Sequence, residues 1–343
     1  MKNNSMYLIV FFLLFSTRTY SQKLENSNAD TSDLKNQKKH SFEPYFRLNS
    51  GTWSSESLQR ESDSNSSLGN SASNGYLSSY DKPSRDRKFE NPGYTSLGFI
   101  YKNHSRKLTF DYNYLVYSQY FKINFKYAGV LGPRGSEQSE VGTAFIYDIH
   151  PYRVENKFAI TKEVFNNGRL TFGIGGGIRK LSIIRERQYP DFIPEYIRYV
   201  ASVSNYSNII NTYGPQVSFR SELHLISSLF FRLNLDYFYT QGQAKYNFET
   251  ININYIYISK GNNVIQFHGF DFNSEISYLF FDRLRLFLGY ELIVSRSKYR
   301  QYNELNSSVD IQTALSSEIK KHEYTQEKTD SLQLWYFGAG YIF

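Results

Sequence analysis

Apolar and polar residues alternate along most of this chain after its first forty residues. The pattern is clearest at residues 108–116, where apolar and aromatic side chains at even positions alternate with Thr109, Asp111 and Asn113. Successive side chains of a β-strand point to opposite faces of the sheet. The alternation therefore predicts strands that carry one apolar and one polar face.

Segments of this kind recur along the chain, and we expect about ten strands, with eight or twelve as the alternatives if an irregular segment is miscounted. The fourth segment is the least regular, because Pro151 interrupts it and cannot donate a ladder hydrogen bond. The ten predicted strands are 42–53, 94–102, 108–116, 143–161, 170–184, 217–224, 231–239, 270–278, 284–295 and 331–343.

Connections of two lengths alternate between these strands. Short links near 103–106, 162–168, 226–228 and 280–283 follow long ones near 54–93, 121–142, 186–212, 249–263 and 298–330. Short turns at one end and long loops at the other are typical of a barrel inserted into an outer membrane from the periplasm. The fold class is therefore all-β, a transmembrane antiparallel up-and-down β-barrel.

The last strand carries the most specific signal. Trp335, Phe337, Tyr341 and the final residue Phe343 share one face of it. A terminal strand of this kind resembles the closing strand of bacterial outer-membrane β-barrels, which the barrel assembly machinery reads. The resemblance implies an outer-membrane location and contact with membrane lipid. An even number of strands places both termini on the short-turn, periplasmic side, and the last strand should pair with the first.

The other end of the chain predicts export. Residues 6–15 are apolar, a run suited to a signal peptide and too short for a bilayer span, and Thr19 and Ser21 are small residues at cleavage spacing. We expect a signal peptide at 1–21, a disordered periplasmic segment at 22–40 and the barrel at 41–343. A buried N-terminal strand or helix is the alternative, disfavoured because a polar tract follows.

Composition supports the membrane interpretation over a soluble β-sandwich. Aromatic residues make up 18% of the chain, with 31 Tyr and 28 Phe, and such rings suit the boundary of a bilayer. The mean hydropathy is −0.52 because a barrel needs apolar residues only on its outer face. The chain has no Cys, so no thiolate metal site or disulfide is expected, and neither is a cofactor. The net charge of +7 is scattered, so nucleic acid is not an expected partner.

The polar faces of the predicted strands carry both signs of charge in similar number. A narrow barrel fills its interior with side chains, so these residues predict either a plug of ion pairs or a thin solute path, with the plug favoured because neither sign dominates. The candidate lumen residues are Arg47, Asp111, Arg179, Arg220, Glu222, Arg232, Asp236, Asp271, Glu275, Arg285 and Glu291.

Two further patterns have a structural and a functional interpretation. The run from Gly173 to Gly177 superficially resembles a phosphate-binding turn, but the sequence continues as strand, which favours glycines that make room inside the barrel or let the wall bend. Asp148-Ile149-His150 resembles the Asp-x-His element of the omptin proteases, which are ten-stranded barrels. That resemblance implies general-base catalysis by an Asp-His pair at the extracellular rim. The second carboxylate pair of that family is absent.

The long connection at 186–212 is unusually apolar for a loop. Tyr189, Phe192, Tyr196 and Tyr199 are its candidate binding residues for an extracellular ligand. The sequence thus predicts a narrow or plugged channel, or a surface structural or ligand-binding protein that uses its long external loops. An omptin-like hydrolase is the alternative.

Overall fold

The computed structural model describes residues 39–60, 76–80, 95–119, 121–130, 139–149, 151–191, 202–226, 228–252, 256–306, 318 and 320–343. The predicted signal peptide and nearly all of the segment 22–40 lie outside these residues. Within the described part of the chain no helix has the length and hydropathy needed to cross a bilayer.

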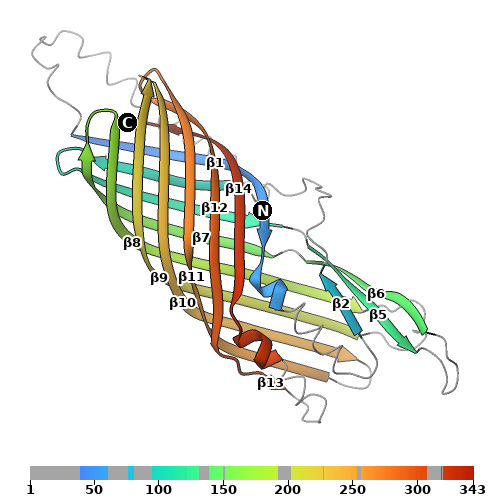
Figure 1. The fold of residues 1–343 in the computed structure, drawn as a ribbon. Coiled ribbons are helices and arrows are strands. Elements are labelled where there is room, and N and C mark those ends of the chain that lie inside the picture. The colour runs from blue at the N-terminus through green and yellow to red at the C-terminus, as the bar shows by residue number, and fades with distance from the viewer. Residues whose placement is uncertain are drawn as a thin grey trace, which may run out of the picture. The chain divides into compact units, whose positions relative to one another are not determined.

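Ten antiparallel strands close into a ring, as predicted. Neighbouring strands follow each other along the chain, and the ring is completed by the pairs β10–β11 and β1–β14 (Figure 1). The strands of the ring are β1 (His40–Ser54), β3 (Thr95–Asn103), β4 (Leu108–Ser118), β7 (Tyr152–Asn166), β8 (Leu170–Asp191), β9 (Ser202–Ile226), β10 (Leu229–Asn252), β11 (Ile256–Phe280), β12 (Leu284–Gln301) and β14 (Lys328–Tyr341).

The predicted pairing of the first and last strands is confirmed. Its register runs from Tyr45 opposite Gly340 to Ser54 opposite Ser331. Beyond the ladder, the Phe343 backbone N–H donates to the Phe42 carbonyl oxygen at 3.0 Å. The closing strand is therefore hydrogen-bonded to β1 as far as the last residue, which leaves no open edge at this seam.

The fourth predicted strand is wrong as a single element. Residues 143–161 divide at Pro151 into the end of β6 (Ser139–Ile149) and the start of β7. β6 belongs to a second, three-stranded sheet with β2 (Tyr76–Tyr80) and β5 (Phe121–Val130), whereas β7 pairs with β4 and β8 in the ring. Pro151 interrupts the pattern because the chain leaves one sheet and enters another there. Two segments predicted as loops thus contribute strands to this second sheet.

The strands β8 to β11 are longer than predicted. Within the long connections predicted at 186–212 and 249–263, residues 186–191, 202–212, 249–252 and 256–263 are strand, and β10 pairs with β11 from Leu229 to Ile251. The short β13 (Leu305–Asn306) adds to β11. These hairpins extend the wall toward the long-loop end, whereas the turns at residues 104–107 and 281–283 keep the other end short.

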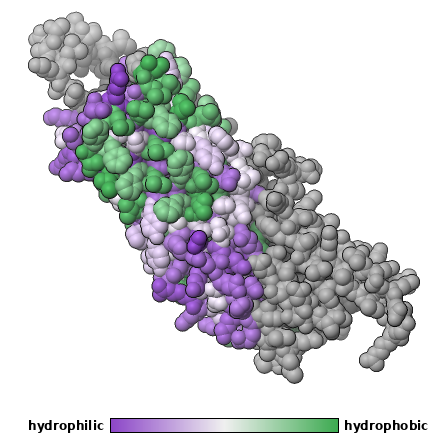
Figure 2. Space-filling view, viewed as in Figure 1, coloured by the Kyte–Doolittle hydropathy of each residue, from purple (hydrophilic) through white to green (hydrophobic). Residues whose placement is uncertain are grey.

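An apolar band surrounds the part of the wall near the short turns. On β10, apolar or aromatic residues occupy every outward position from Leu229 to Tyr239, and Gln241 and Gln243 follow. Ten steps of ~3.4 Å on a strand tilted by ~40° span about 25 Å, the height of a membrane band in such barrels. Figure 2 shows apolar surface gathered over this part of the barrel and hydrophilic surface beyond it.

The wall inverts its polarity above this band. Tyr237 points outward and is 44% exposed, whereas its neighbour Phe238 points inward and is fully buried. Below this level the inward positions of β10 are Arg232, Asn234 and Asp236; above it they include Phe238 and Ala244. Each long strand therefore changes from apolar outside to apolar inside, as expected where a wall passes from lipid into water.

The glycine run in β8 is part of the strand and not a turn. At Gly175 and Gly177, which face inward, an added Cβ would collide with the carbonyl oxygens of Ile160 and Phe158 on β7. The two strand backbones approach each other too closely here for any side chain. These glycines therefore allow close approach of β7 and β8, and no side chain enters the lumen at these two positions.

Replacing Gly177 with Ala should destabilise the barrel by about 1–3 kcal/mol, because β7 and β8 must separate to fit the methyl group. The adjacent Gly176 faces outward, and its nearest neighbour to an added Cβ is the Gln216 carbonyl oxygen at 3.2 Å. Gly176→Ala is the matched control and should change stability little. Urea unfolding of both variants in detergent tests this; equal unfolding midpoints would contradict it.

Candidate functional site

The inside of the barrel has three levels. A cavity of about 520 Å³ opens among residues of the short-turn end; we call it the basin. Next to the basin lies a layer of paired charges. An apolar core fills the interior beyond this layer, toward the long-loop end. Because the basin and the core are on opposite sides of the charges, the lumen is built from layers of different chemistry.

The charged layer is a chain of ion pairs in which positive and negative groups alternate. It connects β14, β7, β8, β11, β12 and β1, and each member contacts the next. In order, its members are Asp330, Arg153, Glu155, Arg179, Asp271, Lys157, Glu291, Arg47, Glu275, Arg285 and Glu43.

Alternation makes this layer possible. Arg179 Nη1 donates to Asp271 Oδ2 at 3.0 Å, and Lys157 Nζ donates to the same oxygen at 2.6 Å. Side-chain exposure is zero for Arg153, Glu155 and Arg179. A buried charge without a partner is strongly unfavourable, so each group is held in place by the opposite charge of its neighbours.

The remaining predicted lumen charges line the wall of the basin. Arg220 pairs with Asp236 and lies 3.6 Å from Asp111, while Arg232 Nε donates to Glu222 Oε2 at 2.5 Å. The eleven candidate lumen residues thus all face the inside, and each has an ion-pair partner among the described residues.

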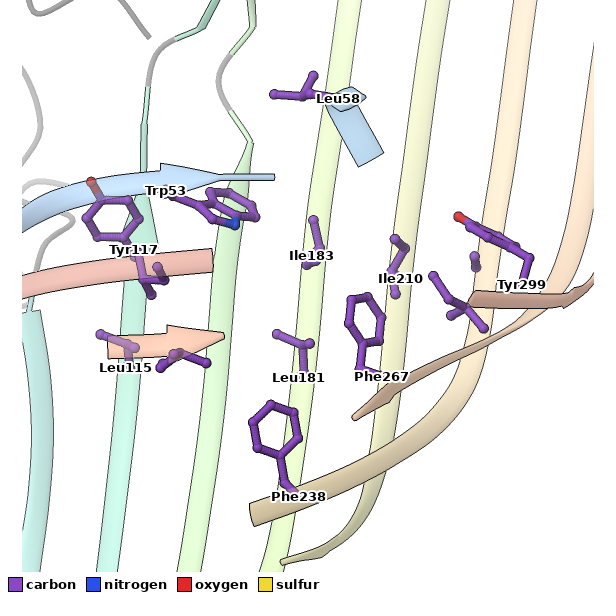
Figure 3. Packing of buried hydrophobic residues seen from close by; sticks show 14 of the residues in the cluster. Trp53, Leu58, Leu115, Tyr117, Leu181, Ile183, Ile210, Phe238, Phe267 and Tyr299 are labelled. Carbon is purple, nitrogen blue, oxygen red and sulfur yellow. The ribbon is translucent and has the colours of Figure 1, made fainter. Parts of the chain in front are cut away.

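The apolar core consists of buried residues contributed by strands all around the ring. Figure 3 shows Leu181 and Ile183 of β8, Ile210 of β9, Phe238 of β10 and Phe267 of β11 projecting into it. Its members are Trp53, Leu58, Leu115, Tyr117, Leu181, Ile183, Ile210, Phe238, Ala244, Ile265, Phe267, Ile293, Tyr299, Tyr302, Leu332 and Leu334. Nearly all are at most 2% exposed, so these side chains are closely packed on one another and removed from water.

A helical turn at residues 56–60 enters the barrel directly after β1. Its Arg60 is fully buried and donates to the carbonyl oxygens of Tyr324 at 2.9 Å, Gln326 at 2.6 Å and Ser297 at 2.7 Å. Arg60 thereby caps the C-terminal end of the helix at residues 320–325, where unpaired carbonyls favour a cation. Burial raises the pKa of the Glu56 carboxyl, and the bonded Arg60 guanidinium opposes this rise.

Asp330 joins this turn to the charged layer, a role that the sequence pattern did not predict. Its Oδ2 accepts from Trp53 Nε1 at 2.9 Å and from the Glu56 backbone N–H, and its other oxygen accepts from Arg153. Asp330 was assigned to the last long loop because it precedes the clear alternation of β14. The i,i+4 spacing of Glu56 and Arg60 was the one sequence signal for an ordered turn here.

Several candidate catalytic and binding residues lie where the structure describes no side chains. Asp148 is in β6, whose backbone alone is described, and His150 lies outside the described residues. Tyr189 is near the end of β8, where the backbone alone is described, and Phe192, Tyr196 and Tyr199 lie outside. Their proposed catalytic and binding roles stay predictions. Within the described chain, no three His or carboxylate side chains are arranged to hold a metal ion.

The residues of the predicted assembly signal form an aromatic seam on the outer face. Trp335 is 62% and Phe337 49% exposed, and the Trp335 ring lies 4.9 Å from that of Tyr290. Phe343 contacts the rings of Tyr341 and Phe42, with centroids 4.9 Å and 6.4 Å apart. The seam joins the apolar band, as a lipid-facing surface requires.

A closed antiparallel ring with an apolar outer band, a charged interior at the level of that band and turns that are short at one end defines an outer-membrane β-barrel. Residues 24–343 match the family model described as predicted outer membrane protein, Leptospiraceae. The chain belongs to this family, and its location is the outer membrane. The short-turn end, which holds the basin, therefore faces the periplasm.

Solved barrels are similar over most of the chain at low sequence identity. The outer membrane protease OmpT from Escherichia coli has 8% identity and a TM-score of 0.42, covering 89% of this chain and 94% of that one. The toluene transporter TodX from P. putida has 9% identity and a TM-score of 0.31, covering 89% and 90%. No curated protein matches the chain.

Pairing in the charged layer can be tested at Arg285, which contacts both Glu43 and Glu275. Arg285→Met should cost about 3–5 kcal/mol because Glu43 would stay buried without its cation. The double variant Arg285→Met/Glu43→Leu should recover much of this loss, since both charges are then absent. Urea unfolding followed by tryptophan fluorescence measures both.

The control is Lys107, whose side chain is 62% exposed in its ion pair with Glu163. Lys107→Met should change stability by about 0–1 kcal/mol. If the double variant is no more stable than Arg285→Met, the loss does not come from an unpaired buried charge.

Proposed function

We propose that this protein is a non-conducting outer-membrane barrel that serves as a rigid support for its external portion, through which it meets partners outside the cell. The observation that carries this proposal is the apolar core, which packs side chains of many strands across the lumen. A solute path needs polar groups or water along its whole length. A level packed with buried apolar side chains therefore favours the plugged barrel over the thin channel.

Two further features support a closed lumen. The charged layer lies against the core, with the Arg179 guanidinium carbon 3.9 Å from the centroid of the Phe238 ring. The helical turn at residues 56–60 adds Leu58 to the core and is fixed by the buried hydrogen bonds of Arg60. The charged layer, the aromatic side chains of the core and the helical turn thus pack on one another across the lumen.

The external half resembles a small soluble β-barrel in its chemistry. Its outward positions on β12 carry Arg296, Lys298 and Arg300, while Ile293 and Tyr299 are buried inside. Such a half-barrel needs no lipid to hold its core. It is suited to present the long connections between strands at a fixed distance from the membrane.

In planar bilayers the purified protein should give no regular stepwise current. The double variant Arg179→Gly/Phe238→Ala removes two large side chains that meet between the charged layer and the core, and it should admit leak currents. Leak currents from this variant would show that the assay detects an opened lumen. Regular current steps from the unaltered protein would sink the proposal in favour of a channel.

A further inference from the structure

The basin contains one cation whose hydrogen-bonding capacity is not used. The side chain of Arg47 is 10% exposed, and its Nη1 and Nη2 atoms lie 3.7 Å from carboxylate oxygens of Glu291 and Glu275. Both separations are too long for hydrogen bonds. The three other arginines that line the basin each donate to a carboxylate. Arg47 alone among them makes no hydrogen bond.

Three aromatic rings hold the Arg47 guanidinium in position. Its carbon lies 4.4 Å from the ring centroid of Tyr336, 4.9 Å from that of Tyr45 and 5.8 Å from that of Phe287. The rings stabilise the charge but accept few hydrogen bonds. A guanidinium that is nine-tenths buried and fixed in this way has planar N–H donors available for an incoming acceptor, and leaving them unused is unfavourable.

The surroundings of Arg47 fit an anion with hydroxyl groups. Six Lys or Arg side chains and four carboxylates line the basin, and Glu43, Asp236 and Glu291 pair with three of its arginines, so the charges around Arg47 are nearly balanced. Burial and the nearby Lys102 lower the pKa of His104 at the rim, so that imidazole is neutral at pH 7. Thr109, Thr161 and Thr171 add hydroxyls to the wall. The carboxylates limit the charge that a ligand can carry.

We propose that the basin is a binding site, open to the periplasm, for a small hydroxylated oxyanion whose carboxylate or phosphate group is held by Arg47. The guanidinium fork matches either group through two parallel hydrogen bonds. The cavity of about 520 Å³ accommodates a molecule the size of a sugar acid. This role is separate from the support function, because the charged layer and the core lie between the basin and the external half.

Gluconate and glycerol phosphate are suitable probes, and they distinguish a sugar acid from a phosphate headgroup. Neutral sorbitol is the matched control ligand. In the exported protein, purified in a non-ionic detergent with ¹⁵N-labelled arginine, either anion at up to about 10 mM should shift the guanidinium resonance of Arg47. Sorbitol should leave that resonance unchanged. A shift with one anion only identifies which oxyanion the site takes.

Arg47→Gln should weaken binding about tenfold or more, because the charged fork is lost. Arg47→Lys, which keeps the charge and so the balance of the charged layer, should bind several-fold more weakly than the unaltered protein. Arg296→Gln is the control, since Arg296 is exposed on the outer wall, and should bind normally.

Three results would overturn the proposal: no shift with either anion, equal binding by sorbitol, or unchanged affinity in both Arg47 variants. If Arg47→Gln does not fold, the resonance shift in the unaltered protein and the affinity of Arg47→Lys still decide the outcome. Heat-modifiable migration on gels checks that each variant is folded.

Discussion

The interior of this barrel depends on the need to pair every charge that is removed from water. Where lipid surrounds the wall, the outer face takes the apolar residues, and the strands must turn their polar side chains inward. There the charges have little water to solvate them. Because the charges alternate in sign from Asp330 to Glu43, each one is paired with a neighbour. The resulting network connects β14, β7, β8, β11, β12 and β1.

Above the membrane, the same strands have water on their outer face and therefore need apolar residues on the inner face. Water outside now favours polar residues on the outer face, so the apolar residues move inside and pack on each other. Phe238 on β10 and Ile293 on β12 begin the apolar core at this level. One wall therefore contains two halves with inverse polarity, and the contact of Arg179 with Phe238 marks the change. At the short-turn end, neither the charged layer nor the apolar core fills the interior, and the basin lies open there.

The alternating pattern predicted much of the fold, because lipid on one side imposes it directly. Ten strands, the short turns, the seam between β1 and β14 and the inward face of residues such as Arg220 and Glu275 all follow from it. The pattern failed where the environment changes. Residues 186–212 were assigned to a loop because the extended hairpin of β8 and β9 lacks a lipid-facing apolar row. Asp330 and Arg60 were missed because their partners come from distant parts of the chain, which spacing along the sequence does not reveal.

The contacts of Asp330 also bear on how the protein folds. Trp53 and Glu56 precede Asp330 by 277 and 274 residues, so the bonds between them bring together the two ends of the barrel sequence. Contacts of such high sequence separation form late and slow the folding of β-proteins. The turn at residues 56–60 finds its binding surface only once β14 is beside β1. Ring closure and filling of the lumen are therefore one cooperative step, and an unclosed sheet lacks a finished interior.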